Sequence, residues 1–275
     1  MKRSPYPAYS PRPLALWLIL ACIATFPSQA ESTAPSASEI LQKAFDTRFN
    51  FDIVQVVELY ARSEMGELHR VLQYATKRID GSLHGLGYFT APAELRGTRM
   101  LMIEQFDRND DFFLYTPSQG KIRRVSSAQR ADAFMGTDLS YEDFERRYVE
   151  DFEISIIGEA TIQGEVGYAI RCEPKYESRH THAIYYVAKS DHAILEVRYF
   201  RQGRDEPIKV QRIPRDKMVS MGNHIVPTQM WVENRLRNTE TEVRFTQIKI
   251  DPELKNSLFS RSALEVGRRI PFLSR

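Results

Sequence analysis

Short strand-like segments separated by tight turns run through most of this 275-residue chain. The segments are rich in Val, Ile, Tyr and Thr, and Gly, Asn, Asp and Ser cluster between them, which is typical of strands and turns. Several connections are too short to hold a crossover helix, so neighbouring strands must be antiparallel and mostly form a meander. The sequence therefore predicts a mainly β fold. The expected strands are 53–61, 68–79, 84–90, 99–106, 111–116, 121–126, 152–158, 166–173, 181–188, 193–200, 207–214, 225–235 and 240–250.

An amphipathic helix is expected just before the first strand. Ser36 and Glu39 fit a capping box, which marks the start of a helix. The apolar residues that follow repeat at three- and four-residue spacing, so one wide face of the helix is apolar. They are Ile40, Leu41, Ala44, Phe45 and Phe49. A short C-terminal helix is also expected, with Pro252 at its favoured first position.

The run of strands is interrupted between residues 126 and 150. Residues 127–135 are compatible with a helix that Gly136 can end, and Ser140 and Asp143 suit the cap of a second one. Two layouts are then open, a sandwich of two sheets or one strongly curved sheet with helices on its concave side. The amphipathic helix and the insert favour the curved sheet, because a sandwich covers its own inner faces.

The first thirty residues predict export from the cytoplasm. Three basic side chains precede or flank an uncharged apolar run over 14–26, and small residues end the segment at Ala30. The apolar run is too short to span a bilayer. We therefore expect a cleaved signal peptide over 1–30, a short linker over 31–37 and a single domain over 38–275. A lipid anchor on Cys22 is disfavoured, because the apolar run continues past that residue.

Loss of the signal peptide changes both the charge and the cysteine content. The formal net charge falls from +2 to −1, because residues 1–30 hold three basic and no acidic side chains. A nearly neutral surface gives no electrostatic reason to expect a nucleic-acid partner. Cys172 becomes the only cysteine, so no internal disulfide can form, and its strand-like surroundings predict a buried thiol.

The chain carries no standard catalytic signature. A nucleophile elbow, a phosphate-binding loop, a zinc-protease helix and paired Cys-x-x-Cys motifs are all absent from the sequence. His180 and His182 could begin a metal site, but no obvious carboxylate or thiolate completes it, so ordinary strand histidines are the favoured interpretation. We expect no enzyme activity, no cofactor and no metal.

A central segment resembles a known protein family. Residues 112–147 read FFLYTPSQGKIRRVSSAQRADAFMGTDLSYEDFERR. An aromatic strand leads to a proline turn, and a Gly-Lys-x-Arg-Arg strand and a Phe-Met-Gly-x-Asp-x-Ser-Tyr-Glu-Asp stretch follow. The matching residues are Gly120, Lys121, Arg123, Arg124, Phe134, Met135, Gly136, Asp138, Ser140, Tyr141, Glu142 and Asp143. With the signal peptide and the opening helix, this order resembles the outer-membrane lipoprotein-sorting branch of the LolA-like superfamily.

The resemblance implies a strongly curved antiparallel sheet, an incomplete β-barrel with helices covering its concave side. It also implies a periplasmic carrier or chaperone that binds acylated cargo, a lipoprotein or a lipid, in an apolar cavity for transfer towards the outer membrane. An inner-membrane exporter or an outer-membrane acceptor would be its partner. The alternative is a lipid-sensing or envelope-stress regulatory domain that acts on an inner-membrane protein. Acyl-chain burial is favourable by about 0.8 kcal/mol per methylene and needs no reactive residue.

Large apolar residues near this segment are the candidate ligand contacts. They are Phe45, Met100, Met102, Phe106, Phe113, Tyr115, Phe134 and Trp231. Ordinary core packing is the competing interpretation for each of them. Lys121, Arg123 and Arg124 place three cations within four residues, and they are candidates for polar contacts at the cavity mouth or with a partner. The competing interpretation is a solvated strand face.

Overall fold

The computed structural model describes residues 35–49, 51–106, 108–271 and 273. The expected signal peptide, Cys22 and the linker up to residue 34 lie outside these residues. Within the described ranges, no helix is long and apolar enough to cross a membrane.

The first helix, α1 (Ala37–Phe49), begins at the predicted cap. The backbone N–H of Ser36 donates to the Glu39 carboxylate at 2.8 Å, and the backbone N–H of Glu39 donates to Ser36 Oγ at 3.2 Å. This capping box satisfies amide groups that the first turn of a helix leaves without partners. The predicted apolar stripe is buried at Ile40, Leu41, Ala44 and Phe45, while Phe49 is more exposed.

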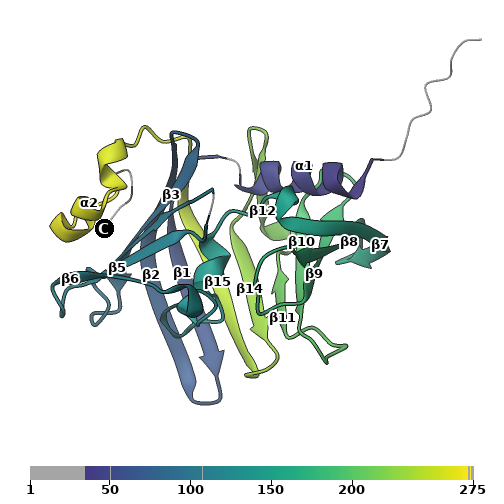
Figure 1. Ribbon diagram of the computed structural model, residues 1–275, viewed down its shortest axis with the longest axis horizontal. Helices are drawn as coiled ribbons and strands as arrows, with labels where there is room; N and C mark the ends of the chain where they lie inside the picture. The colour runs from purple at the N-terminus through teal and green to yellow at the C-terminus, as the bar shows by residue number, and fades with distance from the viewer. Residues whose placement is uncertain (1–34, 50, 107, 272, 274–275) are drawn as a thin grey trace, which may run out of the picture. The chain divides into compact units, whose positions relative to one another are not determined.

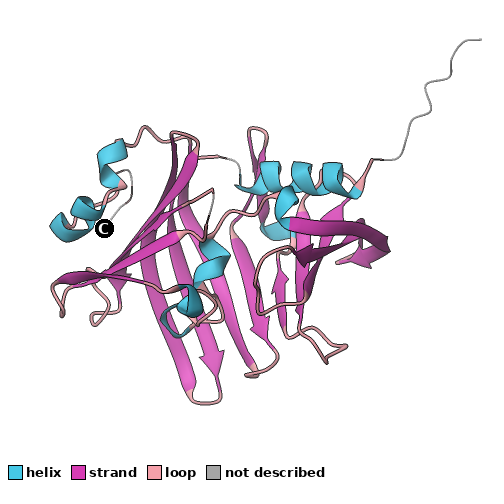
Figure 2. Ribbon diagram, viewed as in Figure 1, coloured by secondary structure: helices cyan, strands magenta, loops and turns pink. Residues whose placement is uncertain are grey.

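Thirteen of the described strands form one antiparallel sheet (Figures 1 and 2). They are β1 (Ile53–Ser63), β2 (Gly66–Ile79), β3 (Ser82–Ala91), β4 (Arg99–Ile103), β5 (Asp111–Thr116), β6 (Lys121–Arg124), β7 (Phe152–Ile162), β8 (Glu165–Pro174), β9 (His182–Ala188), β10 (Ile194–Phe200), β11 (Lys209–Arg212), β14 (Gln229–Asn234) and β15 (Thr239–Ile250). The order across the sheet is β6-β5-β4-β3-β2-β1-β15-β14-β11-β10-β9-β8-β7. The predicted single antiparallel sheet is thus confirmed, and the sandwich is excluded.

The sheet consists of two meanders joined where β1 pairs with β15. Its two edge strands, β6 and β7, follow each other along the chain, so residues 125–151 must run from one edge of the sheet to the other. The segment predicted as one strand over 225–235 is divided at Thr228. Its first part, β13 (His224–Pro227), pairs instead with the unpredicted β12 (Met218–Met221) in a separate hairpin.

Two segments outside the sheet cover one of its faces, each over a different half of the sheet. We call the face that bears Val57 and Val243 the inner face, because residues 125–151 pack against it through Phe134, Leu139 and Tyr141. On the other half of the sheet, α1 packs against β8, β9 and β10. Figure 2 shows α1 beside these strands and short helical turns across the middle of the sheet. This arrangement confirms the expected helical cover of one face.

Two helix predictions were wrong in detail. Residues 127–135 do not form a continuous helix but two short 3-10 turns, Ser127–Gln129 and Phe134–Gly136, separated by irregular chain. The C-terminal helix, α2 (Arg261–Val266), begins well after Pro252, and its cap is Ser260, whose hydroxyl accepts from the Ala263 N–H at 3.2 Å. It covers the outer face rather than the inner one, and the C-terminal segment packs there against Leu86 and Leu101.

Candidate functional site

A cavity of about 210 Å³ opens on the inner face of the sheet. Strands from both meanders form its floor, and the end of α1 and the insert form its walls. The lining residues are Arg48, Phe49, Phe51, Ile53, Gln55, Val57, Tyr74, Thr76, Leu83, Leu139, Glu142, Asp143, Phe144, Glu145, Arg146, Arg147, Tyr185, Ile194, Val197, Tyr199, Gln211, Ile213, Met230, Val243 and Phe245. The floor is mostly apolar, and most of the charged groups lie on the insert.

Strand pairing assembles the floor. Val57 of β1 lies opposite Phe245 of β15, and Gln55 lies opposite Tyr74 of β2, so their side chains project from the same face. Burial raises the pKa of the Tyr74 phenol above its usual range. The hydroxyl of Tyr74 would lie 2.9 Å from a Cβ atom at position 85, so any larger residue there would displace this phenol. The floor therefore depends on Gly85 in the neighbouring strand.

Asp143 fixes the insert over the cavity. Its carboxylate accepts hydrogen bonds from Lys209 Nζ at 2.5 Å, Gln211 Nε2 at 3.0 Å and the Ser140 backbone N–H at 2.7 Å. Burial by itself raises the pKa of Asp143, but the Lys209 ammonium and these hydrogen bonds outweigh burial and lower it. The predicted cap of Ser140 and Asp143 is thus present, and it also attaches the insert to β11.

Glu145 forms a second ionic group in the same wall. Arg130 binds its carboxylate with two guanidinium nitrogens, and Arg147 adds a contact at 3.1 Å. Arg147 also donates to the backbone carbonyl of Glu142 at 2.9 Å. Burial raises the pKa of the Glu142 carboxyl. These bonds hold the chain over 142–147 in one conformation beside the cavity.

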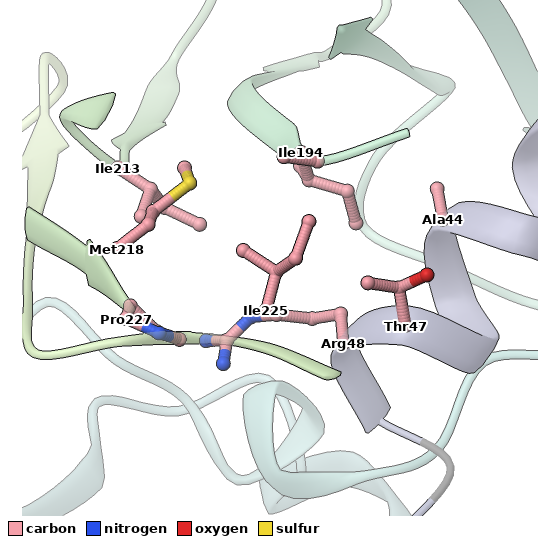
Figure 3. A pocket seen from close by; sticks show the side chains of 9 residues that line it. Ala44, Thr47, Arg48, Ile194, Ile213, Met218, Ile225 and Pro227 are labelled. Carbon is pink, nitrogen blue, oxygen red and sulfur yellow. The ribbon is translucent and has the colours of Figure 1, made fainter. Parts of the chain in front are cut away.

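Arg48 lies in different surroundings. It lines the large cavity and also a small hollow of about 10 Å³, which is close to the space of one water molecule. Figure 3 shows its side chain reaching from α1 past Ile225 towards Pro227. Burial lowers the pKa of this guanidinium to about 10. Among the described residues, its guanidinium carbon makes a cation–π contact with Phe49, 5.2 Å from the ring centroid.

Three predicted contacts lie in the inner-face core beside the cavity, and the fourth lies on the buried side of α1. Met100, Met102 and Phe134 have no exposed surface. Phe45 packs edge-on against the cavity-lining Tyr185, with 5.6 Å between ring centroids. None of the four belongs to the cavity lining. These four side chains lie near the cavity, so they could contact only a ligand that extends beyond it.

The other four predicted contacts lie away from the cavity. Phe113 and Tyr115 project from the outer face, towards the C-terminal segment. Trp231 also projects outward, since its neighbours in β14, Met230 and Val232, pack on the inner face. Phe106 is 72% exposed in the loop between β4 and β5. Sequence reasoning placed these side chains near the motif but could not assign their faces.

Sequence reasoning also missed Met230 and Phe245, which do line the cavity. Apolar and polar residues alternate within 229–234 and 239–250, which indicates strands. This alternation alone does not say which face of the sheet is the inner one.

The three predicted cations lie on the edge strand β6, outside the cavity lining. Arg124 pairs with Asp111 on the outer side, and Arg123 lies opposite Leu114, on the inner side near the Tyr141 hydroxyl. Lys121 is exposed. The proposed role of these cations in partner contacts is therefore separate from the cavity.

The central motif is largely structural. Asp138 is 5% exposed, and its carboxylate accepts from Arg237 at 2.7 Å, Thr239 at 2.5 Å and Thr241 at 2.8 Å. Its own backbone N–H donates to Thr241 Oγ1 at 2.9 Å. These four bonds tie the Phe-Met-Gly-x-Asp stretch to β15 and to the turn that precedes it. Within the described chain, no group of three or more His, Cys, Asp and Glu side chains could hold a metal ion.

A family model described as an uncharacterized protein matches residues 81–266. Three solved structures share the fold. A domain described as an outer membrane lipoprotein-sorting protein, from Vibrio parahaemolyticus, is 19% identical with a TM-score of 0.77, covering 83% of this chain and 98% of that one. A DUF1329 family protein from Desulfovibrio piger is 23% identical with a TM-score of 0.77, covering 84% and 100%. A LolA superfamily protein from Nitrosomonas europaea is 19% identical with a TM-score of 0.67, covering 84% and 100%. No curated protein sequence matches the chain.

Proposed function

Since the chain belongs to the family of uncharacterized proteins whose model matches residues 81–266, and shares its fold with lipoprotein-sorting and LolA superfamily structures, we propose that it is a carrier of acylated molecules. An acyl chain of a lipid or lipoprotein would occupy the cavity on the inner face. The protein would be exported by its signal peptide and would carry this cargo through the periplasm towards the outer membrane. Binding alone would perform this function, without a catalytic residue.

The observation that carries the proposal is the apolar floor of the cavity. Val57, Leu83 and Val243 are buried side chains of three different strands that meet there, and Met230 and Phe245 add flexible or aromatic surface. Each acyl methylene moved from water onto such a surface contributes about 0.8 kcal/mol. The ionic wall above the floor is held by internal partners, so it can close over a chain without losing its own hydrogen bonds.

The size of the cavity limits the ligand that it can hold without a change in the structure. About 210 Å³ is below the roughly 300–1,000 Å³ of typical small-molecule sites. A long acyl chain therefore requires either α1 or the insert to move outward. The fold permits such a movement, since both segments cover the inner face without belonging to the sheet.

A neutral apolar dye, N-phenyl-1-naphthylamine, tests the proposal. We expect its fluorescence to rise when it enters the cavity and to fall when an acyl ligand displaces it. Met230→Trp places a bulky ring in the cavity and should weaken dye binding by about tenfold or more, in line with a loss of 1.4 kcal/mol or more. Trp231→Phe, one residue away on the outer face, is the matched control and should leave binding unchanged. Equal binding by both variants and the wild type would refute the inner-face site.

Native mass spectrometry identifies the cargo. Protein isolated gently from its own periplasm should carry a co-purifying acylated molecule, which lipid extraction then releases. Met230→Trp should carry less of it. A protein that carries no such molecule and binds no dye would not be a carrier of this kind.

A further inference from the structure

Arg48 is a cation without a counter-charge in the part of the chain that the structure describes. No ion pair or hydrogen bond connects its guanidinium to any described residue. The acidic side chains of the cavity wall form no ion pair with it. Asp143 binds Lys209, and Glu145 binds Arg130 and Arg147. Glu142, the third acidic residue of the wall, forms no ion pair with Arg48 either.

The surroundings of Arg48 make this lack of a partner costly. Ile194, Ile213, Ile225 and Pro227 share the small hollow with it (Figure 3). The ring of Phe49 lies beside it. Arg48 is half-buried, and a charged group beside apolar side chains loses part of its hydration, which an opposite charge or hydrogen bonds can replace. The lowered pKa of Arg48 reflects the same loss. Even so, a pKa near 10 leaves the guanidinium charged at neutral pH.

The position of Arg48 relates it to the cavity floor. Arg48, Ile194 and Ile213 line both the hollow and the large cavity, so the guanidinium lies where the two meet. A molecule with its chain on the floor at Val57 and Val243 would have its end group near α1. A guanidinium presents several donors in a planar fork that suits carboxylate and phosphate oxygens.

We propose that Arg48 anchors the anionic headgroup of the bound amphiphile, a carboxylate or a phosphate monoester whose acyl chain occupies the cavity. This inference rests on the proposed carrier function and adds the chemistry of the headgroup. Binding would supply the counter-charge that the described protein does not. The ligand class is therefore a single-chain anionic amphiphile, in preference to a neutral lipid of the same length.

Displacement of N-phenyl-1-naphthylamine tests the headgroup. Dodecanoate, dodecyl phosphate and dodecanol share one chain length and differ in the end group. We expect the better of the two anions to bind the wild type about tenfold or more tightly than dodecanol, as expected for one charge-assisted hydrogen-bonded contact. The stronger of the two identifies the headgroup. Inorganic phosphate, added alone, tests whether a free anion is bound without a chain.

Arg48→Met keeps the length of the stem and removes the charge. Its preference for the anion over dodecanol, measured within this one variant, should fall to less than about twofold. Its Tm should equal or exceed that of the wild type, because an unpaired, half-buried charge is lost. Arg48→Lys should keep part of the preference. Arg146→Met is the matched control, since Arg146 also lines the cavity but stacks on the Tyr148 ring at 4.4 Å.

The outcomes separate the two proposals. Dye binding with equal affinity for dodecanoate, dodecyl phosphate and dodecanol would overturn the headgroup inference and leave the carrier function standing. A preference that persists in Arg48→Met, or disappears equally in Arg146→Met, would also overturn it. If inorganic phosphate alone raises the Tm through Arg48 while no chain binds, the residue holds a free anion and not an amphiphile. No binding of dye or of any chain would refute the carrier function itself.

Discussion

Asp138 carries much of the attachment between the insert and the sheet. Its buried carboxylate accepts from one arginine and two threonines, all on the turn and strand that follow β14. Asp138→Ala would leave Arg237, Thr239 and Thr241 without this partner and the insert without its main anchor. We expect the free energy of unfolding to fall by about 2–4 kcal/mol, as for other broken buried ionic networks. Urea denaturation followed by circular dichroism measures the change.

Asp132 offers a control in the same insert. It pairs with Arg179, but both side chains are more than half exposed. Exposed ion pairs contribute at most about 1 kcal/mol and often nothing measurable. Asp132→Ala should therefore unfold close to the wild-type midpoint. A loss as large as that of Asp138→Ala would show that the insert responds to any substitution and that Asp138 has no special role.

Asp110 gives the protein a predictable pH dependence. Burial, together with the nearby charges of Glu145 and Glu104, raises its pKa from 3.8 to about 7, although a hydrogen bond from the Gln105 N–H opposes the shift. Between these two pH values the folded protein holds a proton that the unfolded chain has released, so stability falls as the pH rises. Above about pH 7 both states are ionised and the loss is complete.

Asp110→Asn removes this titration and retains an oxygen that can accept from Gln105. Its stability relative to the wild type should increase from about pH 4 to about pH 7, by at most about 1.4 kcal/mol per pH unit, and then remain constant. Thermal unfolding of both proteins across this range measures the difference. A difference that is constant with pH would show that Asp110 ionises normally in the folded state, and one that shrinks as the pH rises would show that folding lowers its pKa.

Neighbouring side chains of the strand β14 lie on opposite faces of the sheet, one in the cavity floor and one on the exterior. Met230 and Trp231 are consecutive, and their side chains project from opposite faces of the sheet. Trp231 is the only tryptophan outside residues 1–30. Its fluorescence should therefore stay almost unchanged when an acyl ligand binds to the processed protein. The new indole of Met230→Trp should respond to any ligand that still enters. A strong response of Trp231 itself would place ligand on the outer face.

Most elements were predictable because their cause is local. Alternating residues and turn residues predicted the strands, and the Ser36–Glu39 box predicted the start of α1. The errors occurred where contacts between residues far apart in the sequence determine the local structure. The bonds of Asp138 to β15, together with the positive φ of Met135 (51°), hold the insert in short turns. The strand β12 has four residues and pairs only with β13, so its sequence pattern was too short to predict a strand.

At the scale of the whole molecule, the site depends on topology. The two edges of the sheet are consecutive in the chain, so the insert that joins them must cross one face, and it packs on the inner one. The cavity then gathers residues from α1, the insert and strands of both meanders. No local pattern reports this assembly. The sequence could therefore predict a curved sheet with a helical cover, whereas Arg48 and Met230 became visible only in the assembled domain.

Cys172 provides a probe for the opening that the small cavity requires. The thiol has no exposed surface, it packs in the same core as Ile40 and Leu41 of α1, and burial raises its pKa to about 12. A protonated, covered thiol reacts slowly with N-ethylmaleimide. If an acyl chain enters by displacing α1, ligand should accelerate labelling of Cys172 several-fold in a Cys22→Ser background. Leu41→Ala, which loosens the packing of α1, should accelerate it without ligand.

The matched control for this experiment lies on the opposite face. Leu258 packs in the outer-face core with Leu254 and Phe259, so Leu258→Ala should loosen the C-terminal segment and leave Cys172 protected. Ligand that displaces the dye yet leaves labelling slow would show that α1 stays in place during entry. The moving cover would then be the insert, and the anchor at Asp138 would be the contact that controls loading. Faster labelling in the ligand-bound wild type, with Leu258→Ala unchanged, assigns the movement to α1.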